Sequence, residues 1–177
     1  MENPKTNLAS EVFSSDGKTL GKYYFNDNRT PVTFNELPTH LVDALIATED
    51  IRFYSHSGID FKRTFGAALK FGQDGGGSTI TQQLAKQLFT GEGSRDIIER
   101  ISQKIKEYII AVRLERHYTK NEIITQYLNI YDFNNNADGI RSAARIYFGK
   151  EPIDLDINES AILVGMLKNS SLYDPRP

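Results

Sequence analysis

The fold is decided by the stretch SRDIIERISQKIKEYIIAVRLERH, which runs from Ser94 to His117. Its apolar residues recur at steps of three and four, and this spacing predicts one long amphipathic helix. We expect the apolar stripe to face the core of a mostly α-helical protein. The stripe consists of Ile97, Ile98, Ile101, Ile105, Tyr108, Ile109 and Val112.

Clear start and stop signals surround further helices on the C-terminal side of this stretch. Thr119–Glu122 and Asp156–Glu159 are capping boxes, and each predicts the first turn of a helix. Residues 139–148 predict another helix, which Gly149 would end. The apolar residues of the two capped helices are Ile123, Ile124, Tyr127 and Leu128 in the first, and Leu163, Met166 and Leu167 in the second.

The N-terminal side predicts a hairpin followed by three helices. Residues 8–25 predict a β-hairpin that turns at Asp16-Gly17. Helices are then expected after Pro38, after Asp60 as N-cap, and after Ser78 or Thr79, with a glycine-rich loop at residues 72–77. Their apolar faces would be Leu41, Ala44, Leu45 and Ile46; Phe61, Phe65, Ala68 and Leu69; and Ile80, Leu84 and Leu88. We divide the chain into an N-terminal hairpin and linker, residues 1–34, and a helical domain, residues 35–177.

Composition excludes several classes of function. The chain has 177 residues, a net charge of -2 and no cysteine. The charge argues against a general nucleic-acid binder, and the missing cysteines exclude disulfide, thiolate and zinc-thiolate chemistry. No apolar run is long enough to span a membrane, and no signal peptide opens the chain. Both ends are polar, which favours a piece of a longer protein.

Carboxylates in unusual settings are the candidates for chemistry. Glu49-Asp50 ends an apolar helix, where the helix dipole disfavours negative charge. A part-buried acid there suits a general base, although a solvated helix end explains it equally simply. Glu107 lies beside the apolar stripe of the long helix, and an ordinary surface pair with Lys104 is its alternative.

The stretch from Gly75 to Gln83 predicts an anion site. Glycines lead into a helix whose free N–H groups and hydroxyls can bind phosphate, and Lys86 adds a cation on the face of Gln82. The alternative is a flexible loop before a capped helix. The three histidines have no helical metal-site spacing.

Taken in order, these segments resemble the peptidoglycan glycosyltransferase domain of class A penicillin-binding proteins, glycosyltransferase family 51. E-D-x-x-F-x-x-H-x-G matches residues 49–58, and G-x-S-T-[IL]-T-Q-Q matches residues 76–83. R-K-x-x-E and A-x-x-L-E resemble residues 103–107 and 111–115. The fourth motif resembles residues 120–129, 139–140 and 147–150, and the fifth resembles residues 161–167 and 173–175. Two positions depart from the pattern: Gln103 replaces the usual Arg, for which Arg100 one turn earlier is a partial substitute, and Asn134 replaces a Gly that the left-handed turn favours.

The resemblance implies a lysozyme-like helical fold and the polymerisation of lipid II. Members join its disaccharide units into β-1,4 glycan at the outer, periplasmic face of the bacterial cytoplasmic membrane, with inversion at the anomeric carbon and release of undecaprenyl diphosphate. Glu49 would be the catalytic base and Glu107 the second catalytic acid, with Asp50 as a support for Glu49. Substrate-binding roles carry over to Asp50, Arg52, Phe53, His56, Ser78, Thr79, Gln82, Gln83, Lys86 and Lys104.

The resemblance also implies partners. No cofactor is certain, but Mg²⁺ or Mn²⁺ near Glu107 and the diphosphate is expected. Lipid II, the growing glycan chain and the membrane surface are the expected partners, with residues 66–72 against the membrane. A full-length relative would carry an N-terminal transmembrane helix and a C-terminal transpeptidase domain. Two rival functions are a glycan hydrolase, which would not need a diphosphate site, and a silent lipid II-binding module, which only Gln103 favours.

Overall fold

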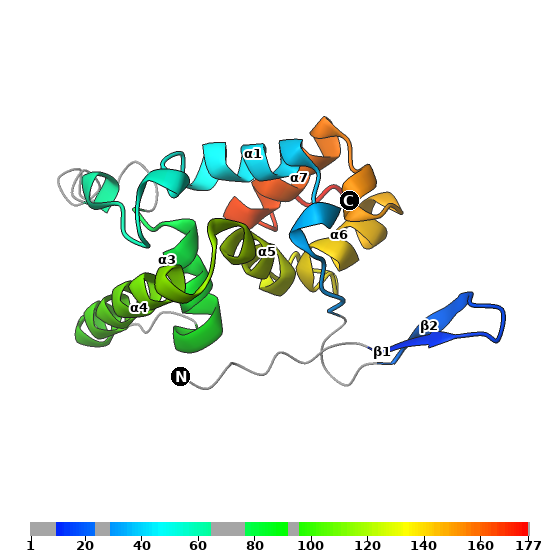
Figure 1. Cartoon of the computed structure of the whole chain (residues 1–177), viewed down its shortest axis with the longest axis horizontal. Coiled ribbons are helices and arrows are strands. Elements are labelled where there is room, and N and C mark those ends of the chain that lie inside the picture. The colour runs from blue at the N-terminus through cyan, green and yellow to red at the C-terminus, as the bar shows by residue number, and fades with distance from the viewer. Residues whose placement is uncertain (1–9, 24–28, 65–76, 92–95, 177) are drawn as a thin grey trace. The chain divides into compact units, whose positions relative to one another are not determined.

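The computed structural model describes residues 10–23, 29–64, 77–91 and 96–176. It is mostly helical, as predicted, and its helices are labelled in Figure 1. They are α1 (Thr39–Glu49), α3 (Ile80–Ala85), α4 (Ile97–His117), α5 (Lys120–Ile130), α6 (Gly139–Phe148) and α7 (Ile157–Lys168). Short 3-10 segments cover Phe34–Glu36, Phe53–Ser55 and Pro152–Asp154, and a π-helical turn covers Lys86–Thr90.

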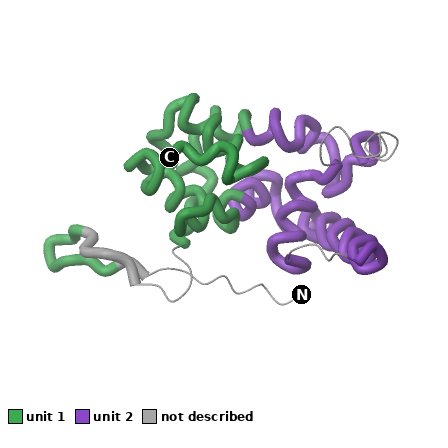
Figure 2. The backbone as a smooth tube through the Cα atoms, turned by 180° about the vertical axis from the view of Figure 1, so that it is seen from behind, with its two compact units in different colours: residues 1–44, 128–177 green, residues 45–127 purple. Residues whose placement is uncertain are grey.

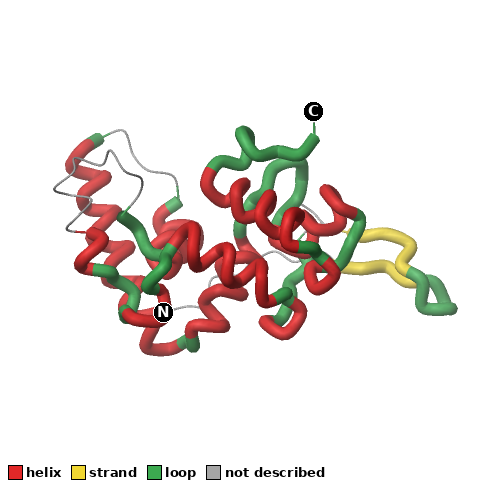
Figure 3. Tube along the Cα trace, turned by 90° about the horizontal axis from the view of Figure 1, so that it is seen from above, coloured by secondary structure: helices red, strands yellow, loops and turns green. Residues whose placement is uncertain are grey.

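The sheet of the described residues is a single hairpin near the N-terminus (Figure 3). Strands β1 (Ser10–Phe13) and β2 (Thr19–Tyr23) pair antiparallel, with Ser10 opposite Tyr23 and an irregularity between Val12 and Phe13. The turn contains Gly17 at a φ of +82°, which only glycine adopts without strain. The predicted hairpin is therefore confirmed.

The chain forms two compact units, coloured separately in Figure 2. Unit 1 comprises Met1–Ala44 and Leu128–Pro177, and unit 2 comprises Leu45–Tyr127. In unit 1 the predicted capping box at Asp156 starts α7, and Gly149 ends α6 in the left-handed conformation. Asn134, Asn135 and Asn136 also adopt positive φ, so the turn that the missing glycine put in question is kept.

Unit 2 is built around the packing of α3 against α4. The loop after Phe53–Ser55 approaches α4 so closely that a Cβ at Gly58 would lie 2.8 Å from the Ala111 carbonyl carbon. Glycine is therefore needed at this position. The core beneath consists of Leu45, Phe53, Ile80, Leu84, Ala85, Ala111, Leu114, Ile123, Ile124 and Tyr127.

The prediction that the isoleucine stripe of α4 faces the core is wrong. Ile97 and Ile98 are 71% and 78% exposed, and Ile101, Ile105 and Ile109 are each more than half exposed. The face that α4 buries carries Glu107, Ala111 and Leu114 instead. Small and polar residues let α3 and the Gly58 loop approach α4, so the core lies on a side of the helix that hydrophobic spacing does not mark.

The predicted second helix is only partly described. Its first turn begins at Phe61, and the carboxylate of Asp60 caps it by accepting from the Arg63 N–H at 3.0 Å. Phe61, which the sequence places on the apolar face of this helix, is exposed. Phe65, Ala68, Leu69 and the predicted membrane segment 66–72 lie outside the described residues. Within the described part of the chain, no helix is both long enough and apolar enough to span a bilayer.

Candidate active site

Glu49 is the last residue of α1, and its side chain is held by α3. The Gln83 amide donates to Glu49 Oε2 at 2.8 Å, and the Arg63 guanidinium donates to the main-chain oxygen of Glu49. Among the residues that the structure describes, Gln83 is the one side chain bonded to the Glu49 carboxylate. Glu49 is half-buried. The arrangement occupies one carboxylate oxygen and leaves the other for a proton.

The neighbouring Asp50 is buried and ties the end of α1 to the start of α3. Its Oδ2 accepts from the Ile80 N–H at 3.1 Å and lies 2.9 Å from His56 Nε2. The free N–H groups at a helix start carry partial positive charge, so the carboxylate stabilises α3. Asp50 and His56 thus fix the position of Glu49 relative to the first turn of α3.

The start of α3 is a capping box, and of the two predicted caps, Ser78 and Thr79, the structure uses Thr79. The Thr79 hydroxyl accepts from Gln82 N–H at 3.1 Å, and the Gln82 side chain reaches back to Thr79 N–H. Both side chains also donate to the carbonyl oxygen of Gly58, at 2.7 and 3.1 Å. Thr79 and Gln82 therefore hold the loop after residues 53–55 against α3.

A cavity of about 510 Å³ lies between α3, the π-helical turn and the first half of α4. Its lining consists of Ser78, Gln82, Gln83, Lys86, Ile97, Arg100, Ile101, Gln103, Lys104 and Glu107. Three cations face one carboxylate in this set, so the cavity suits an anion. Gln83 is shared: it lines the cavity and also bonds to Glu49, which is not among the lining residues.

Lys104 is positioned by two neighbours inside the cavity. Its ammonium donates to the Ser78 hydroxyl at 2.6 Å and to Glu107 Oε2 at 2.7 Å. Glu107 is only 6% exposed, so this is a part-buried pair and differs from the surface pair weighed as its alternative. Together Ser78 and Glu107 hold one cation at the wall of the cavity.

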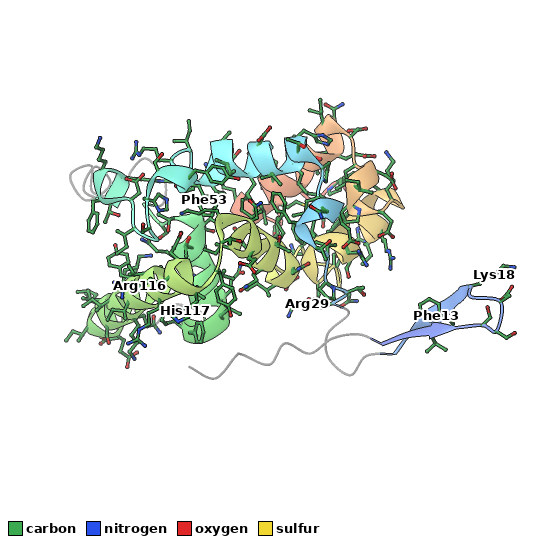
Figure 4. The ribbon with its side chains drawn as sticks, viewed as in Figure 1. Phe13, Lys18, Arg29, Phe53, Arg116 and His117 are labelled. Carbon is green, nitrogen blue, oxygen red and sulfur yellow. The ribbon has the colours of Figure 1, made fainter. Side chains whose placement is uncertain are left out.

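Five predicted substrate contacts have partners in the protein and do not line the cavity: Asp50 and Thr79, described above, and Arg52, Phe53 and His56. Arg52 pairs with Asp60 at 2.8 Å; this bond lowers the pKa of Asp60 and raises the pKa of Arg52. Phe53 is buried, with the Lys120 ammonium 4.3 Å from its ring centre. His56 is bound to Asp50. These contacts order the segment that follows Glu49, in which Figure 4 labels Phe53.

Sequence reasoning missed several residues of the site. Ile97 and Ile101 were assigned to the core but line the cavity, and the role of Tyr127 behind Gln83 had no signal. Arg100 precedes Lys104 by four residues, which places both on one helix face. Arg100 was not missed: the sequence suggested it as a partial substitute for the Arg usual at position 103, and it lines the same cavity as Gln103.

Comparison with known proteins identifies the family. The family model described as Transglycosylase matches residues 16–177. The chain belongs to the transglycosylase family. This membership confirms the resemblance drawn from the motifs and the prediction of a glycosyltransferase.

Relatives of this transglycosylase chain are much longer proteins. It is 40% identical to penicillin-binding protein 1F of Bacillus subtilis over 171 residues, which cover 94% of the chain and 23% of the relative. It is 37% identical to penicillin-binding protein 1A of Escherichia coli over 180 residues, which cover 99% of the chain and 20% of the relative. It is 39% identical to penicillin-binding protein 2a of Streptococcus pneumoniae over 164 residues, which cover 93% of the chain and 22% of the relative. The chain thus spans about a fifth of the length of these relatives.

Proposed function

We propose that the chain polymerises lipid II into β-1,4-linked glycan, with Glu49 as general base. One observation carries this proposal: the Gln83 side chain donates to the Glu49 carboxylate and also lines a cavity that contains three cations. An acid and a cluster of cations that share one glutamine suit a reaction that removes a proton at one point and releases an anion at another.

The chemistry follows from this separation. Glu49 takes the proton from the 4-hydroxyl of the acceptor's GlcNAc as that oxygen attacks C1 of the donor's MurNAc. The bond from C1 to the lipid diphosphate breaks on the opposite face, so the configuration at C1 inverts. Lys86, Arg100 and Lys104 stabilise the charge that develops on the departing diphosphate, and the Ser78 hydroxyl orients Lys104. Because this charge is greatest in the transition state, these contacts accelerate the reaction.

The cavity is also suited to the lipid part of the substrate. Ile97 and Ile101 line it beside the cations, and Ile98, Ile105 and Ile109 continue an exposed apolar surface along α4. Exposed basic residues border this surface: Lys106, Arg113 and Arg116, the last of which is labelled in Figure 4. Apolar residues with neighbouring cations are typical of helices that lie on anionic membranes. We place this surface, called here the isoleucine face (Ile97, Ile98, Ile101, Ile105 and Ile109), against the outer face of the cytoplasmic membrane.

A divalent cation would find little support from the protein. Within the described ranges no group of three His, Cys, Asp or Glu could hold a metal ion. Glu107 is the one carboxylate lining the cavity, and Lys104 already donates to it. We therefore propose that Mg²⁺ or Mn²⁺, where it takes part, arrives on the diphosphate and touches Glu107 alone. No step above depends on it.

The test is polymerisation of purified lipid II by the chain and by Glu49→Gln. We expect Glu49→Gln to lower the rate by at least roughly a hundredfold, the scale of a positioned general base. Asp43→Asn is the matched control, because Asp43 is an exposed acid on the same helix. If Glu49→Gln kept the polymerisation rate of the unsubstituted chain, Glu49 would not be the general base.

The same assay separates the two rival functions. Shortening of preformed glycan would identify a hydrolase, and lipid II binding without turnover in either form would identify a binding module.

A further inference from the structure

Behind Gln83 lies a second hydrogen bond that the chemistry above does not use. The hydroxyl of Tyr127 on α5 donates to Gln83 Oε1 at 3.0 Å. On its other side the same amide donates from Nε2 to Glu49 Oε2 at 2.8 Å. Tyr127 is 0% exposed, so its hydroxyl is held in place by the core. The three side chains thus form one hydrogen-bonded series that runs from the core of unit 2 to the end of α1.

The two ends of a glutamine amide are not equivalent. The nitrogen end only donates hydrogen bonds and the oxygen end only accepts them. An ionised carboxylate only accepts, so Gln83 helps Glu49 only when its nitrogen faces the acid. Rotation about the last side-chain torsion is easy in glutamine, and half a turn would bring the amide oxygen against Glu49 instead. The Tyr127 hydroxyl opposes this rotation, because its O–H donates to Oε1 in the present orientation and would lose that acceptor if Nε2 took its place.

The need for such a restraint changes during the reaction. Before proton transfer the negative carboxylate itself favours the nitrogen end of Gln83. After Glu49 has taken the acceptor's proton, the acid can donate, and a free amide would turn to accept from it. That turn would draw the proton-bearing oxygen toward Gln83 and away from the acceptor site. The next cycle would then begin with Glu49 misdirected.

We propose that Tyr127 is a positioning residue for the glycosyl transfer and acts through Gln83. By fixing the orientation of the amide it keeps Glu49 Oε2 occupied and directs the other carboxylate oxygen to the acceptor hydroxyl. This inference rests on the proposed role of Glu49 as general base. Tyr127 is not among the residues that line the cavity and it bonds to Gln83, so we expect its effect to fall on turnover and to leave lipid II binding unchanged.

A double-mutant cycle tests this inference, because Tyr127 is also part of the core. Tyr127→Phe removes the hydroxyl and keeps the ring. Gln83→Met keeps the length of the side chain and removes both ends of the amide. We expect Tyr127→Phe to lower kcat for lipid II polymerisation roughly tenfold, with KM within about twofold, because misplaced reacting groups slow turnover by up to roughly a hundredfold. In the Gln83→Met background the same substitution should change kcat by less than about twofold, since nothing remains for the hydroxyl to orient.

The outcomes separate this inference from the proposed function. If the unsubstituted chain does not polymerise lipid II, or Glu49→Gln keeps its rate, the proposed function fails and the inference fails with it. If turnover depends on Glu49 but Tyr127→Phe keeps its full rate, only the inference is overturned. It is also overturned if Tyr127→Phe lowers kcat equally in both backgrounds, because that result would mean a structural effect independent of Gln83. Thermal unfolding of all four forms identifies any loss of turnover that follows from unfolding.

Discussion

Helices α4 and α6 have the same kind of sequence and opposite surroundings. Both carry apolar residues at helical spacing, and both were predicted as helices, α4 from that spacing and α6 with Gly149 as its end. In α6 the apolar residues Ile140, Ala143 and Ala144 are buried. In α4 five of the six isoleucines are exposed, and the buried face carries Glu107, Ala111 and Leu114.

The difference shows that hydrophobic spacing identifies an apolar face but not what covers it. In α6 the apolar face is part of the core of unit 1. In α4 the buried side is the one with Ala111, where the Gly58 loop approaches closely, and Ile97 and Ile101 line the cavity instead. We interpret α6 as a structural helix. On the proposed function, the exposed apolar residues of α4 contact the lipid part of the substrate and the membrane surface.

The largest expected effect is on stability, and it should separate the two helices. Ile140→Ala in α6 should lower the free energy of unfolding by about 2–5 kcal/mol, because Ile140 is fully buried and the cavity left behind adds to the loss. Ile105→Ala in α4 should change it by less than about 0.5 kcal/mol, since that side chain is about half exposed. Urea unfolding of both variants measures the difference. Equal losses would mean that the isoleucine face is covered in solution.

Membrane binding should depend on α4, whose isoleucines are expected to contribute little to stability. Ile98→Gln with Ile105→Gln should weaken binding to anionic phospholipid vesicles at least about tenfold, because each isoleucine that enters the interface contributes about 1.5–3 kcal/mol. Replacing the exposed Ile153, which belongs to unit 1 and not to α4, with Gln is the matched control and should leave binding unchanged. Flotation of the protein with vesicles measures both. Unaltered flotation of the double variant would rule out the isoleucine face as the membrane contact.

A smaller effect is expected from the cation that this chain places in its cavity. Arg100→Ala should lower kcat/KM for lipid II polymerisation about five- to tenfold, the scale of one charge contact at an exposed site. Lys168→Ala is the control, because Lys168 is an exposed cation of α7 that does not line the cavity. If both variants keep the full rate, Arg100 does not compensate for Gln103.

The fold was predictable where it depends on neighbouring residues. The caps at Thr79 and Asp156, the end of α6 at Gly149 and the Gly17 turn are all decided within a few positions of the chain, and the structure confirms each. The exposure of α4 depends on which segment packs against it, and the bond from Tyr127 to Gln83 joins residues 44 positions apart. Such contacts follow from the folded chain and leave no local pattern in the sequence.

The smallest expected effect concerns the start of α7, which carries the buried Leu163 and Met166. The Glu159 N–H bonded to the Asp156 carboxylate is the main cause that lowers the pKa of Asp156 below its ordinary value of 3.8. A carboxyl group whose pKa is lowered by folding stabilises the native state above that ordinary value, and this contribution is lost as the pH falls through the folded pKa. The free energy of unfolding should therefore decrease below about pH 4, and Asp156→Asn should reduce the slope of that decrease while it keeps a capping side chain. Urea unfolding between pH 2 and pH 7 measures the slope, with Asp43→Asn as the control in a helix interior. An unchanged slope in Asp156→Asn would show that the cap contributes equally in both charge states, and that α7 depends on its buried face alone, as α6 does.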